Sequence, residues 1–84
     1  MTAFSNAQTA RLRWHCRRGM RELDVLLMKY LDQVFPQAGS AAQAAFAALL
    51  ELQDPELLAL LTGKLTCERK DMADVIDQLT RLGG

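Results

Sequence analysis

Residues 20–35, with the sequence MRELDVLLMKYLDQVF, carry the clearest structural signal of the chain. The apolar side chains of this segment recur every three or four residues, at Leu23, Leu26, Leu27, Tyr30, Leu31 and Val34. This spacing aligns them on one face of an α-helix, so we expect a helix with that face in the core. Pro36 lacks a backbone N–H group and is expected to end the helix.

A second helix is predicted on the N-terminal side of this segment, over residues 7–17. Ser5 or Asn6 can serve as its N-cap, because short polar side chains accept hydrogen bonds from the first free amides of a helix. Gly19 follows at the place where a residue in the left-handed conformation ends many helices. The two helices are therefore expected to meet at a tight corner.

Two more helices are predicted after Pro36. Ser40 and Gln43 have the spacing of a capping box, which indicates the start of a third helix. Asp54 and Pro55 have the pattern of an N-cap followed by the first helical residue, where proline loses no hydrogen bond. This fourth helix is expected to run to residue 61, and Gly63 is expected to close it.

A fifth helix is predicted from Thr66 or Cys67 onward, and no segment shows the alternation typical of a half-buried strand. With 84 residues and 9.4 kDa, the chain is long enough for one small domain. We therefore predict an all-α fold, a five-helix bundle that forms a single domain over residues 1–84. The ends, at about residues 1–5 and 83–84, are expected to be disordered.

The charge of the chain is balanced in sum and uneven in distribution. Ten basic and ten acidic residues give a formal net charge of zero, so charge alone does not predict a nucleic-acid or membrane partner. However, residues 1–21 contain five arginines and no acidic residue. The longest unbroken apolar run, residues 44–50, is far shorter than the roughly twenty residues that span a bilayer. We therefore expect no membrane insertion.

Catalytic and metal-binding residues are not predicted. His15 and Cys16 are the only neighbouring pair that suggests nucleophilic catalysis, but adjacent side chains on a helix point in directions about 100° apart. A surface His15 and a small buried Cys16 are the simpler interpretation. A structural zinc site needs four converging ligands, and the chain has two cysteines and one histidine. A thiol-redox role for Cys16 and Cys67 is a weaker alternative.

The junction between the first two predicted helices has an unusual composition. Arg18 precedes Gly19, and Glu22 follows in the next helix. A cation at a helix C-terminus and an anion at a helix N-terminus both complement the helix dipoles, so a purely structural role is one interpretation. The other interpretation is a docking corner for a protein partner, in which an arginine and a carboxylate lie beside an exposed Trp14.

This junction resembles the opening of a known family. Residues 13–27, RWHCRRGMRELDVLL, are similar to the SdhE/YgfY succinate dehydrogenase assembly factors, with that family's RGxxE motif at Arg18, Gly19 and Glu22. A second stretch resembles the family at Leu49, Leu50, Glu51, Asp54, Pro55, Glu56 and Leu57. The similarity extends from residue 11 to about residue 82. The family's fold, a small bundle of five helices, agrees with the fold predicted from periodicity.

The resemblance implies an assembly factor rather than an enzyme. Members of the family bind the flavoprotein subunit of succinate dehydrogenase, and in bacteria also fumarate reductase, and promote covalent attachment of FAD to a histidine of that subunit. By this likeness the chain binds no cofactor stably itself and acts on FAD attachment in its partner. We expect a monomer when it is alone. By this likeness the motif residues Arg18, Gly19 and Glu22 lie against the flavoprotein. The other candidate partner-binding residues, which surround the motif, are Trp14, Arg17, Met20, Arg21 and Asp24.

The chain differs from many members of the family at Leu60. Many relatives carry a tryptophan at the position of Leu60, so contacts of the fourth helix are not carried over. We also expect no mitochondrial address of the kind that eukaryotic members need, and two cysteines are too few for a disulfide framework. Both features favour a bacterial cytoplasmic protein.

Nucleic-acid binding through the N-terminal arginine cluster is the main alternative function. Five arginines lie within eleven residues, and Trp14 could stack on a base. The acidic residues Glu22 and Asp24 follow the cluster directly, however, and would repel phosphate. A toxin–antitoxin role is a more distant hypothesis, because no catalytic centre supports it.

Overall fold

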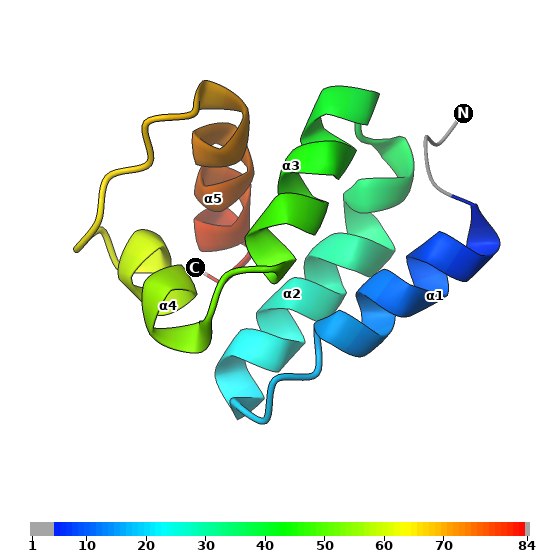
Figure 1. Cartoon of the computed structure of the whole chain (residues 1–84), viewed down its shortest axis with the longest axis horizontal. Helices are drawn as coiled ribbons and strands as arrows, with labels where there is room; N and C mark the ends of the chain where they lie inside the picture. The colour runs from blue at the N-terminus through cyan, green and yellow to red at the C-terminus, as the bar shows by residue number, and fades with distance from the viewer. Residues whose placement is uncertain (1–4, 84) are drawn as a thin grey trace.

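Helices account for most of the chain. The computed structural model describes residues 5–83, which contain five α-helices arranged as in Figure 1. They are α1 (Asn6–His15), α2 (Arg21–Gln33), α3 (Ser40–Leu50), α4 (Asp54–Leu61) and α5 (Lys70–Gly83), with a short 3-10 helix η1 (Phe35–Gln37) after α2. Within the described range there is no strand, which confirms the all-α prediction. No helix in that range is long and apolar enough to cross a membrane.

The helices pack around one core. α5 contacts α2, α3 and α4. α1 packs on α3 and is joined to α2 by an ion pair. The ring of Tyr30 stacks on the ring of Phe46, with 4.5 Å between centroids, and Phe35 packs beside Phe46. The buried apolar residues come from all five helices and η1: Leu12, Cys16, Leu23, Leu27, Tyr30, Leu31, Phe35, Ala45, Phe46, Leu49, Leu50, Leu57, Met72, Val75 and Leu79.

The structure confirms the helix predicted from the periodic segment, but this helix, α2, ends earlier than predicted. Four of the six predicted apolar positions are buried, and Leu26 and Val34 pack against the core with partial exposure. The α-helix ends at Gln33 instead of residue 35, and the chain continues as η1. The physical reason is Pro36, whose missing N–H and bulky ring are incompatible with the interior of an α-helix.

The capping box is present at a different helix from the predicted one. Ser5 is the N-cap of α1: its hydroxyl accepts from the amide of Gln8 at 3.2 Å, and the Gln8 side chain accepts from the amide of Ser5 at 2.8 Å. At α3 the prediction is wrong, because Gly39 is the N-cap and Ser40 the first helical residue. Gln43 is buried instead, and its Nε2 donates to the carbonyl of Phe35 at 2.8 Å.

Several helix boundaries also differ from the predicted ones. α1 ends at His15 rather than residue 17, and α5 begins at Lys70 rather than at Thr66 or Cys67. α4 ends at Leu61 as predicted, and Gly63 follows with a φ of +81°. Of the ends expected to be disordered, Ser5 caps α1 and Gly83 ends α5, while residues 1–4 and 84 lie outside the described part of the chain.

Candidate partner-binding site

The corner between α1 and α2 is held in one conformation by its own backbone contacts. We define the corner as residues 16–24, which comprise the C-cap of α1, the connecting loop and the first turn of α2. Gly19 has a φ of +80°, which confirms the predicted left-handed residue. The carboxylate of Asp24 accepts from the amide of Arg18 at 2.9 Å and from the amide of Gly19 at 3.1 Å. Asp24 therefore fixes the loop and is itself only partly exposed.

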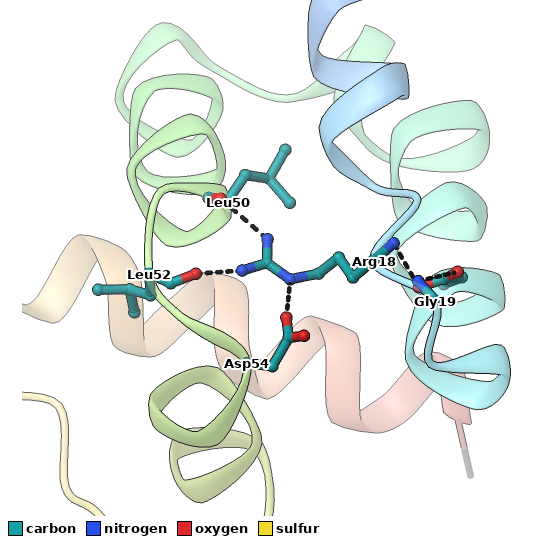
Figure 2. A network of polar contacts seen from close by, with 6 residues as sticks. Arg18, Gly19, Leu50, Leu52 and Asp54 are labelled. Atoms are coloured by element: carbon teal, nitrogen blue, oxygen red, sulfur yellow. Dashed lines mark hydrogen bonds and ion pairs between the residues drawn. The ribbon is translucent and has the colours of Figure 1, made fainter.

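The side chain of Arg18 points inward from this corner, as Figure 2 shows. Its Nε donates to the carboxylate of Asp54, and its two terminal nitrogens donate to the backbone carbonyls of Leu50, at 2.9 Å, and Leu52. Only 12% of the side chain is exposed. The guanidinium thus joins the corner to the connection between α3 and α4.

Five of the eight predicted partner-binding residues lie on the surface: Trp14, Arg17, Gly19, Arg21 and Glu22. Trp14 is the most exposed large apolar residue of the described chain, at 70%. It lines an open surface groove together with Leu52 and Pro55. The other three predicted residues, Arg18, Met20 and Asp24, are built into the corner, and Met20 packs against the core.

The arginine cluster is partly neutralised within the molecule. Arg13 forms an exposed ion pair with Asp32 at 2.7 Å, and this hydrogen bond raises the pKa of Arg13. Arg18 is paired with Asp54. Within residues 5–83, the remaining arginines of the cluster, Arg11, Arg17 and Arg21, form no ion pair and are exposed. The cationic surface is therefore smaller than the sequence alone suggests.

Cys16 and His15 do not form a reactive pair. Cys16 is fully buried, and burial raises the pKa of its thiol to about 11, so the group is a neutral thiol at neutral pH. His15 is exposed. These positions agree with the simpler interpretation of the two residues. Among residues 5–83 no group of three His, Cys, Asp or Glu side chains converges as metal ligands.

Comparison with known proteins identifies the family. The family model described as Sdh5, flavinator of succinate dehydrogenase, matches residues 10–82. This chain belongs to the Sdh5 family. The matched range includes the corner and all the residues that Arg18 contacts. Membership confirms the predicted assembly factor and argues against an enzyme.

Several relatives of this Sdh5 family member share one description, FAD assembly factor SdhE. The FAD assembly factor SdhE of Vibrio cholerae is 40% identical over 76 residues, which are 90% of this chain and 88% of that protein. The FAD assembly factor SdhE of Shewanella oneidensis is 41% identical over 70 residues, 83% of this chain and 85% of the relative. That of Colwellia psychrerythraea is 39% identical over 80 residues, 95% of this chain and 88% of the relative.

Sequence reasoning missed the residues that receive the Arg18 side chain. Asp54 was expected to cap α4, but Gln53 is the N-cap and the Asp54 carboxylate turns to Arg18 instead. The carbonyls of Leu50 and Leu52 are free to accept because they lie where α3 ends and before α4 begins. One signal was available, since Asp54 belongs to the second stretch that resembles the Sdh5 family. Leu60, at the position of the family tryptophan, is half-buried and packs against the core.

Proposed function

We propose that this chain binds the flavoprotein subunit of succinate dehydrogenase, or of fumarate reductase, through the corner and promotes covalent attachment of FAD to that subunit. The observation that carries the proposal is the exposed pair Gly19 and Glu22 on a corner whose loop is hydrogen-bonded to Asp24, in a chain that belongs to the Sdh5 family. The relatives are FAD assembly factors, which supports this reaction. The exposed Trp14 beside the corner supports a protein partner, because tryptophan and arginine are enriched among residues that dominate binding energy.

The chemistry of the corner indicates what the facing surface of the flavoprotein carries. Glu22 presents a carboxylate at the first turn of α2, and Arg17 and Arg21 present guanidinium groups on either side of it in the sequence. A complementary surface therefore offers a donor or cation to Glu22 and carboxylates or carbonyls to the two arginines. Mixed charge of this kind selects one orientation of the partner and rejects others.

The proposed mechanism requires no reacting group from this chain. Cys16, whose thiol is the nucleophile within the corner, is buried and neutral. A helper that binds the flavoprotein best in the arrangement suited to bond formation raises the population of that arrangement by its differential affinity. Holding the flavin and the accepting side chain in place lowers the barrier, because positioning and pre-oriented charges account for much of enzymatic rate enhancement.

We place this activity in the bacterial cytoplasm, with the chain acting as a monomer that holds no FAD of its own. Both cysteines are free, and reducing compartments keep thiols in that state. The relatives named above come from bacteria.

In-gel flavin fluorescence tests the proposal. The apo-flavoprotein subunit is incubated with FAD, with or without this chain, and denatured, so that only covalently bound flavin remains fluorescent. We expect the wild-type chain to increase the signal and Glu22→Ala to abolish the increase. Asp74→Ala is the matched control, since Asp74 is an exposed acid on α5. An active, folded Glu22→Ala would refute docking through the corner.

A further inference from the structure

Arg18 makes contacts that leave its guanidinium little capacity for a second protein. Each of its three nitrogens donates to an acceptor within the chain: the Asp54 carboxylate, the Leu50 carbonyl and the Leu52 carbonyl. Arginine is suited to this because its planar group presents several donors in a fixed geometry. Three of the five N–H groups of the guanidinium are thus used within the chain, and 12% of the side chain is exposed, so little of the group is left for a partner to contact.

The backbone of Arg18 is hydrogen-bonded within the chain, as its side chain is. Its amide and the amide of Gly19 both donate to Asp24, in the first turn of α2. Arg18 thus connects three segments: the loop after α1, the first turn of α2 that carries Glu22, and the connection from α3 to α4 (Figure 2). The loop and the first turn are local in sequence, but the third segment lies 32 to 36 residues away.

We propose that Arg18 and Asp54 act together as a positioning pair, which sets the placement of Gly19 and Glu22 for docking, and that Arg18 does not itself bind the partner. The inference rests on the proposed function and deepens it. Arg17 and Arg21, which are exposed and unpaired within residues 5–83, are then the cations that the corner offers to the flavoprotein. Asp54 becomes a functional residue although it lies on α4, outside the corner.

The test combines two measurements on the same full-length variants. The first is the rate of covalent flavin formation in the apo-flavoprotein subunit. The second is the set of backbone amide resonances of Gly19 and Glu22 in the isotope-labelled chain, recorded without any partner. Asp54→Ala removes the acceptor. If circular dichroism shows that this variant is unfolded, Asp54→Asn, which retains a side-chain oxygen, is used in its place. Arg18→Lys retains the charge and loses the planar fork.

We expect Asp54→Ala to slow flavin attachment by about tenfold or more and to shift both amide resonances in the free chain. Arg18→Lys combined with Asp54→Ala should lose no more than the stronger single variant, because the two residues act through one contact. Asp32→Ala is the matched control, because it breaks the ion pair between Arg13 and Asp32 instead. It should change neither the rate of flavin attachment nor the Gly19 and Glu22 amide resonances.

Three results would overturn the inference. Full activity of Asp54→Ala with loss in Arg18→Lys would mean that Arg18 acts without Asp54, either on the partner or through the Leu50 and Leu52 carbonyls. Loss in Asp54→Ala with unshifted Gly19 and Glu22 resonances would make Asp54 a contact residue. Losses that multiply in the double variant would make the two residues independent. If the wild-type chain promotes no attachment at all, the proposed function fails, and the amide resonances alone then decide whether the pair positions the corner.

Discussion

Arg18 and Asp54 lie 36 residues apart in the sequence, and their side chains form an ion pair that connects the corner to α4. Arg18 also donates hydrogen bonds to the carbonyls of Leu50 and Leu52. These carbonyls belong to the end of α3 and the following connection, where helical partners are lacking. One side chain therefore satisfies a helix end and fixes the relative position of two segments.

The first prediction concerns the stability that this pair contributes. We expect Asp54→Ala to lower the free energy of unfolding by about 1–3 kcal/mol, because it leaves a largely buried guanidinium without its charged partner. Urea denaturation at neutral pH measures the difference. Asp32→Ala breaks the exposed pair with Arg13 and should cost at most about 1 kcal/mol. Equal losses in the two variants would contradict the distinction between the pairs.

The second prediction separates backbone strain from docking at Gly19. Gly19 and Gly63 have nearly the same φ, +80° and +81°, and a Cβ at either position would meet nothing within 4 Å. Gly19→Arg and Gly63→Arg should therefore each cost about 1–2 kcal/mol, from the left-handed backbone alone. Only Gly19→Arg should lose binding to the flavoprotein subunit, measured by calorimetry. An equal loss of binding in Gly63→Arg would assign the effect to strain.

The third prediction concerns the exposed Trp14. Because its ring is 70% exposed, Trp14→Ala should change the unfolding free energy by less than about 0.5 kcal/mol. If Trp14 contacts the partner, the same variant should weaken binding by about 1–2 kcal/mol or more. Leu65→Ala is the control, since Leu65 is an exposed apolar residue in the connection between α4 and α5. Unchanged affinity in Trp14→Ala would remove Trp14 from the docking surface.

The fourth prediction follows from the thiol of Cys16. Burial raises its pKa from the ordinary value of 9.0 to about 11, so the native state retains the proton that the unfolded state releases. This contribution to stability is fully present below pH 9 and is lost as the pH rises toward 11. Its size is about 3 kcal/mol, from two pKa units at about 1.4 kcal/mol each. Urea unfolding at neutral and alkaline pH, compared between wild type and Cys16→Ala, measures it, and the variant should lose less stability at high pH.

Alkylation gives an independent check on Cys16. At mildly alkaline pH, iodoacetamide should modify the partly exposed Cys67 in the native chain and modify Cys16 only after unfolding. Mass spectrometry counts the modified thiols and locates them. Rapid native modification of Cys16 would show that the base of the corner opens in solution.

The fifth prediction concerns Tyr30 in the core. Its hydroxyl is buried and finds no hydrogen-bond partner among residues 5–83, and burial also raises the pKa of the phenol. Tyr30→Phe removes this unsatisfied group and retains the ring that stacks on Phe46. We expect thermal denaturation to show unchanged or higher stability, by up to about 1 kcal/mol. A loss of more than about 1 kcal/mol would indicate that water or a neighbouring group satisfies the hydroxyl.

Local signals predicted the helices well and their caps less well. Periodicity identified α2 and its buried face, Gly19 was recognised as a left-handed residue, and Gly63 was recognised as the residue that closes α4. The errors lie where a side chain had a distant alternative. Gln43 and Asp54 both have the local pattern of a cap, but in the fold one donates to Phe35 and the other accepts from Arg18.

In the candidate site, too, some features follow from the local sequence and others depend on the tertiary structure. The amino-acid order alone established five helices, a left-handed glycine between the first two, and a corner rich in charge, because these depend on interactions within a few residues. The inward direction of Arg18 depended on the packing of α4 beside the corner, since its acceptors come from residues 50–54. A hydrogen bond between distant segments forms only when the core has brought them together, so the tertiary structure decided which charged residues of the corner are internal and which remain available to a partner.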